Sequence, residues 1–299
     1  MRVAIITKHL AVPAAMSTVP AAVPIERQAS HGASCARESG GSTHAYFLGA
    51  CVLLFLASLA ATIVLCRSMA GGMPMPGAWQ MSMAWMAMPG QSRLAAALMF
   101  MGMWNTMMLA MMLPALAPAL LRYRVALCKV SSQRVNVQTA LAGLGYFAVW
   151  ALVGVLVYFP GTQLAKILMA SASLARLVPL ASGAILVAAG VFQLTSAKAR
   201  LLQRCRCVPA GCPTRDRNFR EAWSYGIGLG KDCVWCCAGW LAVLLVTGMA
   251  SFWSMGLVTV AISAERLLQK PERATRLTGT LLVVMALWIT GRSLGAIAP

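Results

Sequence analysis

Three Met-x-Met pairs lie in one short, uncharged segment of the sequence, residues 71–90. In an extended chain, residues two apart point to the same side, so each pair presents two thioethers together. A thioether is soft and neutral, and it suits Cu(I) or Ag(I) in an oxidising compartment where free thiols are lost. The alternative is an interfacial loop anchored in the headgroup region by Trp79 and Trp85. The six methionines are Met73, Met75, Met81, Met83, Met86 and Met88.

More methionines follow in the next apolar segment, at helical spacing. Met99, Met103, Met107 and Met111 are each four residues apart, which places them on one stripe of a helix. Such a stripe would pass a soft monovalent ion from one thioether to the next, and we take Met103, Met107 and Met111 as candidate ligands. The alternative is plain packing, because flexible methionine fills gaps between membrane helices well. A neighbouring stripe holds Met101, Met108 and Met112.

The cysteines concentrate elsewhere, in the pattern C-x-x-C-C formed by Cys233, Cys236 and Cys237. Positions i, i+3 and i+4 share a helical face, so three sulfurs would converge at what we take to be the cytoplasmic mouth of a membrane span. Lys231 nearby would favour the thiolate, which is the form that binds metal. The alternative is three small packing residues. Cys205, Cys207 and Cys212 lie just before, in a basic segment.

The elements that would position these sulfurs are membrane helices. The chain is 60% hydrophobic and 11% charged, with a mean hydropathy of +0.74, far too apolar for a soluble domain of 299 residues. Several runs approach the roughly 20 apolar residues that cross a bilayer. We predict an all-α, polytopic helical membrane bundle with about seven spans. They are Tyr46–Cys66, Leu94–Leu116, Thr139–Phe159, Leu177–Thr195, Gly226–Gly248, Phe252–Ala264 and Leu277–Ile297.

The distribution of positive charge orients this bundle. Most of the 25 Lys and Arg fall on one side, which we assign with the N-terminus to the cytoplasm. The net charge of +18 then belongs to a face against anionic lipid and does not indicate nucleic-acid binding. We expect residues 1–45 to be a disordered cytoplasmic tail that holds all three histidines, so a histidine metal site within the membrane is excluded. Residues 46–299 form a single domain, with an outer methionine-rich loop at 67–93 and a basic, cysteine-containing cytoplasmic loop at 196–222.

These segments together resemble a known family. The stretches are "GGMPMPGAWQMSMAWMAMPGQS", "MMLAMMLP" (107–114), "QLT" (193–195), "DCVWCC" (232–237) and "AERL" (264–267). They are similar, over roughly residues 68–290, to a bacterial family described as predicted metal-binding integral membrane proteins. The family was long a domain of unknown function, and some members are linked to copper delivery to copper oxidases. Members of the family have a proline-lysine-cysteine pattern after "QLT" and a glycine before the final cysteine pair. Here Ser196-Ala197-Lys198 and Leu201 stand in the first place and Trp235 in the second, which makes Cys205, Cys207 and Cys212 less secure as ligands.

The resemblance and the sulfur pattern together indicate copper handling in a bacterial inner membrane. We expect a Cu(I) transporter or a metallochaperone for the assembly of copper enzymes, not an enzyme. Its partners would be membrane lipid and a copper enzyme or copper chaperone, and a homo-oligomer is compatible with the sequence. One alternative is a transmembrane thiol oxidoreductase, which would need cysteines at both ends of the membrane. The other is an assembly scaffold whose methionines only pack.

Overall fold

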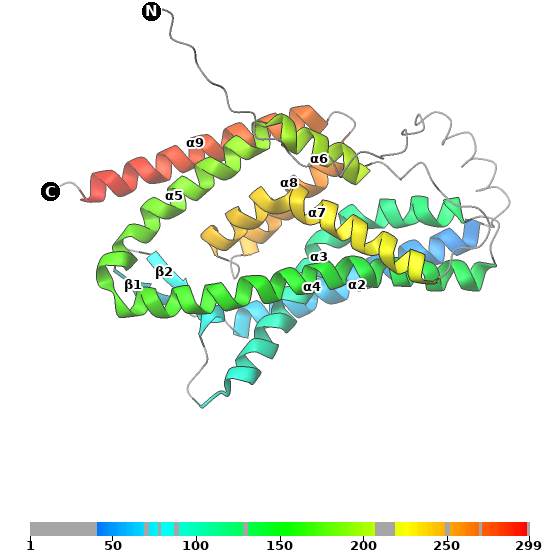
Figure 1. The fold of residues 1–299 in the computed structure, drawn as a ribbon, viewed down its shortest axis with the longest axis horizontal. Coiled ribbons are helices and arrows are strands. Elements are labelled where there is room, and N and C mark those ends of the chain that lie inside the picture. Colours follow the sequence, from blue (N-terminus) through cyan, green and yellow to red (C-terminus); the bar gives the residue numbers. More distant parts are fainter. Residues whose placement is uncertain are drawn as a thin grey trace, which may run out of the picture.

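The computed structural model describes residues 41–68, 72–76, 79–86, 90–127, 131–206, 219–248, 252–268 and 271–297 (Figure 1). These residues form eight α-helices, a two-stranded hairpin and one short 3-10 helix. The all-α class is thereby confirmed. The elements are α2 (Gly41–Ser68), β1 (Gly72–Met75), β2 (Trp79–Ser82), η1 (Met83–Trp85), α3 (Arg93–Ala126), α4 (Ser132–Ala170), α5 (Ala172–Leu194), α6 (Ser196–Arg206), α7 (Phe219–Thr247), α8 (Phe252–Leu267) and α9 (Pro271–Ile297).

Five of these helices are long and apolar enough to cross a membrane, namely α2, α3, α4, α5 and α7. Each of the seven predicted spans falls on a helix, but α8 has only 16 residues and α9 is polar and basic at its start. A count of seven spans therefore stays a prediction. Helix α2 begins inside the segment expected to be a disordered tail, of which residues 1–40 lie outside the described part. Within the loop expected at 196–222, residues 196–206 form the helix α6.

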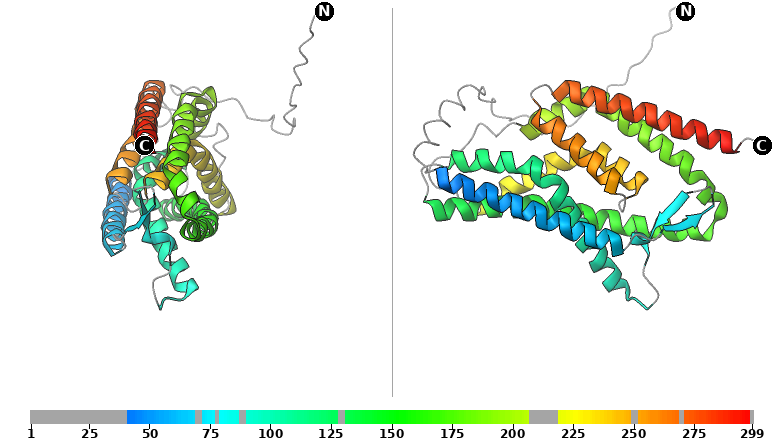
Figure 2. Two further views of the ribbon diagram at one scale, coloured as in Figure 1. Left: turned by 90° about the vertical axis from the view of Figure 1, so that its left-hand side faces the viewer. Right: turned by 180° about the vertical axis from the view of Figure 1, so that it is seen from behind.

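The long helices run back and forth between two ends of the molecule, and α6 continues α5 toward one of them (Figures 1 and 2). One end holds the β1–β2 hairpin, the junction of α4 with α5, and the end of α9. We call it the hairpin end. The other holds α6 and the junction of α3 with α4, and we call it the α6 end. Helix α3 changes direction along its 34 residues, where Pro114 and Pro118 each remove a backbone hydrogen bond.

Helices α4 and α7 pack against each other along much of their length. Glycines allow this close approach: a Cβ on Gly226 would collide with the backbone of Ala142, and one on Gly145 would lie 2.6 Å from the carbonyl oxygen of Trp223. Small residues let membrane helices bring their backbones together in this way. The contact places Tyr146 of α4 opposite Cys233 of α7, where the sulfur groups gather.

Candidate metal centre

Three sulfur atoms meet in the core between α3 and α7. The Sγ of Cys233 lies 3.9 Å from the Sδ of Met112 and 3.9 Å from the Sγ of Cys237. All three side chains are at most 2% exposed. We call Met112, Cys233 and Cys237 the sulfur triad. It lies near the middle of α7, deeper than the mouth of the span at which the cysteines were expected.

The spacing of the cysteines explains which of them join the triad. Cys233 and Cys237 are one helical turn apart and share a face, whereas Cys236 is turned by about 100° from its neighbour Cys237. Cys236 is equally buried and interacts with the side chains of both Cys205 on α6 and its neighbour Cys237. Among the described residues, no three His, Cys, Asp or Glu side chains converge on a point that would hold a metal ion. The third sulfur beside Cys233 and Cys237 is instead a thioether, from Met112.

Two polar side chains face the sulfur triad. The hydroxyl of Tyr146 on α4 donates a hydrogen bond of 2.9 Å to the Sγ of Cys233. The Nη2 atom of Arg266 on α8 lies 3.8 Å from the Sγ of Cys237 and 3.7 Å from that of Cys205. Lys231, expected to be the cation beside the thiols, is exposed on another face of α7. The cation that faces Cys237 and Cys205 is therefore Arg266 and not Lys231.

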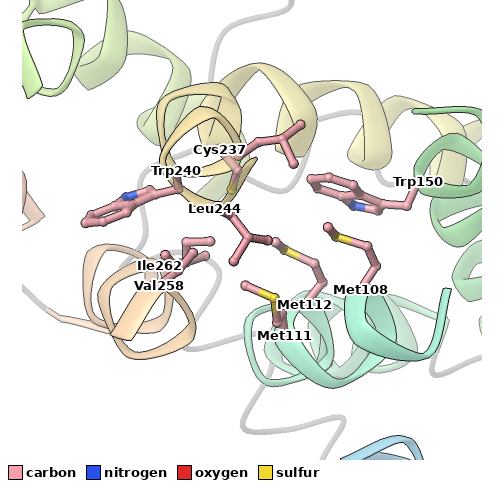
Figure 3. Close-up of a pocket in the computed structure, with 10 residues that line it drawn as sticks. Met108, Met111, Met112, Trp150, Cys237, Trp240, Leu244, Val258 and Ile262 are labelled. Atoms are coloured by element: carbon pink, nitrogen blue, oxygen red, sulfur yellow. The ribbon is translucent and has the colours of Figure 1, made fainter. Parts of the chain in front are cut away.

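A small cavity adjoins the triad on its α8 side (Figure 3). Its volume is about 10 Å³, close to the room that one water molecule needs. Met108, Met111 and Met112 reach into it from α3, opposite Cys237 and Trp240 of α7, with Trp150 of α4 at one side (Figure 3). The cavity therefore holds about one water-sized group beside the triad.

The predicted methionine stripe of α3 is buried. Met103, Met107 and Met111 are all at most 3% exposed, and Met111 lines the cavity beside the triad. The neighbouring Met108 and Met112 are buried as well, so five thioethers occupy about 14 Å of helix, at 1.5 Å for each residue. Met99, at the start of the stripe, is 37% exposed. The thioethers thus continue from the triad toward the hairpin end.

The predicted methionine-rich loop contains the β1–β2 hairpin. Met73 pairs with Met81 across the two strands, and Met75 pairs with Trp79, so these side chains share one face. Met75 and Met81 are buried against Ala165 and Ala175 at the α4–α5 junction, while Met73 is 38% exposed. Met86 packs at the edge of the same cluster. Met83 begins η1 and its side chain is outside the described part, as is all of Met88.

An aromatic cluster lies between the hairpin and the buried methionines. The ring centroids of Trp85 and Phe100 are 5.4 Å apart, and those of Phe100 and Trp104 are 6.0 Å apart. The ring of Trp85 occupies the space that a Cβ on Gly161 would need. The indole of Trp104 donates a hydrogen bond of 2.8 Å to the carbonyl oxygen of Trp150. These rings hold the hairpin against α3 and α4 in a fixed position.

A buried ion pair fastens α6 beside the triad. The Nζ of Lys198 lies 2.8 Å from a carboxylate oxygen of Glu265 and donates a 2.6 Å hydrogen bond to the carbonyl oxygen of Cys236. Burial opposes the charge of Lys198, but Cys236 and Glu265 outweigh it and raise the pKa of this lysine above its ordinary value. Glu265 also accepts hydrogen bonds from Trp240 and Thr278. The pair therefore joins α6, α7, α8 and α9 around the sulfur groups.

Comparison with known families bears on this arrangement. Residues 101–289 match the sequence profile of the PpoB2 family, described as copper chaperones. The match covers more than half of the chain. The chain belongs to this copper chaperone family. No curated protein and no solved structure is detectably similar to it.

The region that matches the copper chaperone family contains the sulfur triad, the buried methionines of α3, Arg266, and the Lys198–Glu265 pair. The hairpin methionines precede residue 101 and lie outside the match. The resemblance inferred from the sequence is therefore confirmed for the family and for most of the predicted extent. The methionine-rich loop at 67–93 is not part of the matched region.

Sequence reasoning did not place Met112, Tyr146 or Arg266 at the site. Met112 belongs to the secondary stripe of α3, and its pairing with Cys233 depends on how α3 and α7 pack. Arg266 and Glu265 lie within "AERL", a stretch quoted for its resemblance to the family. The sequence signal for these two residues was their position as adjacent charges at the end of an apolar segment, because charges in such surroundings are usually paired and functional.

Proposed function

We propose that this member of the copper chaperone family carries Cu(I) on the sulfur triad and passes it to a copper enzyme during assembly. The observation that carries the proposal is the pair of 3.9 Å distances that join Cys233 to Met112 and to Cys237. A metal–sulfur bond of about 2.3 Å places two ligands of a trigonal ion about 4.0 Å apart. The two distances from Cys233 therefore already match the spacing of ligands around a trigonal ion, and copper is the cargo of this site.

The chemistry of the donors favours Cu(I) in particular. Two thiolates and one thioether are soft ligands, and soft ligands select Cu(I) over hard divalent ions such as Mg²⁺ or Ca²⁺. The tyrosine hydroxyl fixes the orientation of the Cys233 sulfur, as a second-shell hydrogen bond does for many metal ligands. Because all three sulfurs are buried, transfer by ligand exchange with a partner is favoured over release into water. This supports a chaperone over a transporter.

The order of the sulfur groups suggests a route. We place the hairpin end on the outer face of the bacterial inner membrane and the N-terminus in the cytoplasm, as the charge distribution indicates. Met73, Met75 and Met81 would take up Cu(I) on the shared face of the hairpin. Met103, Met107 and Met111 would relay it along α3 to the triad, with Met108 and Met112 beside them. Thiolates bind Cu(I) more tightly than thioethers do, so the ion would come to rest at Cys233 and Cys237.

The coordination of bound copper tests this proposal directly. We expect X-ray absorption of the Cu(I)-loaded protein in detergent to show sulfur ligands alone, with a mean coordination near three. Met112→Leu removes one donor without changing the charge, so the coordination number should fall toward two. Met285→Leu, on α9 away from the triad, is the matched control and should leave the spectrum unchanged. Nitrogen or oxygen ligands in the wild-type spectrum would contradict the assignment.

The role of the hairpin needs a separate test. We expect that replacing all six methionines of residues 73–88 by leucine lowers the copper stoichiometry, because the thioethers are lost while the apolar packing of Met75 and Met81 is kept. The measurement is the Cu(I) content of the purified protein at saturation. An unchanged stoichiometry would assign the hairpin methionines to packing alone and leave the sulfur triad unaffected.

The thiol oxidoreductase alternative receives less support from the geometry. An electron relay needs thiols at both ends of the membrane, and among the described residues of the hairpin end the cysteine available is Cys66, buried at the end of α2. Cys233 also lies as close to a thioether as to a second thiol, and a thioether forms no disulfide. A mixed thiol–thioether group is what a soft metal site requires.

A further inference from the structure

A buried arginine lies between α2 and α3, at the α6 end of the molecule (Figures 1 and 2). Arg124 is the third residue from the end of α3, and it is only 6% exposed. The Cζ of its guanidinium lies 4.8 Å from the centre of the Phe47 ring on α2. Its Nε is buried and has no hydrogen-bond partner among the described residues, and no described carboxylate forms an ion pair with it. In the described part of the chain, Arg124 is therefore a buried charge without a counter-ion.

The groups around Arg124 do not balance its charge. The face of the Phe47 ring attracts a cation, and the carbonyl end of α3 adds a partial negative charge. Both effects are smaller than the cost of taking an ion out of water. Arginines near a membrane surface usually extend their head groups into water, as the exposed Arg122 and Arg134 do at the same end of the molecule. The burial of Arg124 indicates that an anion from outside the described residues completes this site.

The depth of Arg124 in a bilayer limits what this anion is. The apolar segment of α2 that is long enough to span a membrane begins at Ala45. At 1.5 Å for each residue, Phe47 lies about 3 Å inside that segment. This level is the boundary between the hydrocarbon core and the headgroups, where the phosphates of phospholipids lie. Arg124 packs on Phe47 and so faces the phosphate layer.

The surface beside Phe47 fits the rest of a lipid molecule. Leu48, Val52 and Leu56 are each one turn apart on α2, and all three are exposed. They form an apolar stripe that begins next to Phe47 and continues toward the middle of the span, where acyl chains would lie along it. Exposed arginines at the α3–α4 junction attract lipids that carry a net negative charge.

We infer that Arg124 binds the phosphate of an anionic phospholipid whose acyl chains lie along α2. The guanidinium is a planar fork that donates parallel hydrogen bonds to two phosphate oxygens. A headgroup with a net charge of −1 cancels the charge of Arg124, whereas a zwitterionic headgroup brings its own cation close to Arg122 and Arg134. The site does not involve copper. Because α2 ends before residue 101, half of the site lies outside the region that matches the copper chaperone family.

Native mass spectrometry of the copper-free full chain in detergent tests this site. The chain is titrated with phosphatidylglycerol, which is anionic, or with phosphatidylcholine, which is zwitterionic. We expect the wild type to bind one phosphatidylglycerol with a Kd about tenfold below that for phosphatidylcholine, because a hydrogen bond to a charged group is worth about that factor. Arg124→Gln should remove this preference. Arg122→Gln is the matched control, since it removes the same charge from an exposed residue two positions away, and it should change the Kd by less than about twofold.

Each other outcome contradicts the inference. Equal affinity of the wild type for the two lipids would overturn it, and this measurement needs no variant to fold. An equal loss in Arg122→Gln and Arg124→Gln would assign lipid binding to the general positive charge of this end. Displacement of phosphatidylglycerol by millimolar inorganic phosphate would make free phosphate the ligand, and we expect none. Arg124→Lys keeps the charge but lacks the fork, so it should weaken phosphatidylglycerol binding by about threefold even where Arg124→Gln does not fold. Unchanged binding in Arg124→Lys would overturn the site.

Discussion

Replacing either cysteine of the sulfur triad by serine is expected to abolish tight Cu(I) binding. The hydroxyl of serine is hard and stays protonated, so Cys233→Ser or Cys237→Ser leaves the ion with one thiolate and one thioether. We expect the affinity to fall by at least about a hundredfold, since the loss of an outer-shell partner alone costs about 10- to 100-fold. The measurement is a Cu(I) titration against a competing chelator.

Cys66→Ser is the matched control for this experiment. Cys66 is as buried as the triad cysteines but lies on α2, outside the sulfur groups, so its replacement tests for general damage to the fold. Cys236→Ser should weaken binding less than either triad variant, because its sulfur interacts with Cys205 on α6 as well as with Cys237. In the host, loss of copper enzyme activity should follow the same order in a deletion strain that expresses each variant. Full activity with both triad cysteines replaced would contradict a carrier role for the triad.

The sequence was sufficient to predict that several of the candidate sulfur ligands share a helical face. Cys233 and Cys237 are one turn apart and fall on one face of any helix, and the four-residue spacing of Met103, Met107 and Met111 predicts a single stripe. Local helical geometry determines both results, and the structure buries all five residues. The long apolar runs likewise predicted the helices, because a segment of that composition is stable only when its backbone is internally hydrogen-bonded.

Local helical geometry does not predict contacts between helices that are far apart in the sequence. Met112 is 121 residues from Cys233 along the chain, and the two meet because α3 and α7 pack together. Lys231 is close to the cysteines in sequence, yet it lies on the exposed side of α7, while Arg266 arrives from α8. Because Lys231 is only two residues from Cys233, the sequence suggested Lys231 as the cation beside the thiols, whereas in the structure that cation is Arg266. Helical geometry likewise does not predict the contacts of the Cys236 side chain, because these depend on where α6 packs.

The largest expected effect on stability concerns the ion pair of Lys198 and Glu265. Both side chains are at most 2% exposed, and the carboxylate also accepts hydrogen bonds from Trp240 and Thr278. Glu265→Leu would leave a buried ammonium group without its counter-ion and the Trp240 indole without an acceptor. Removing one partner of a buried pair costs about 3–5 kcal/mol. We expect the free energy of unfolding in detergent to fall by that amount.

A double variant distinguishes the ion pair from simple packing at this position. Lys198→Met with Glu265→Leu removes both charges together, and replacing a whole buried pair by apolar groups is often close to neutral. The double variant should therefore be more stable than Glu265→Leu alone. Glu221→Gln, at an exposed acid on α7, is the control and should change the free energy of unfolding by no more than about 0.5 kcal/mol. A double variant as unstable as the sum of the two single variants would show that the charges do not compensate each other. If they do, the pair holds α6 and Cys205 in place beside the triad, and Glu265→Leu should also weaken Cu(I) binding although it removes no sulfur.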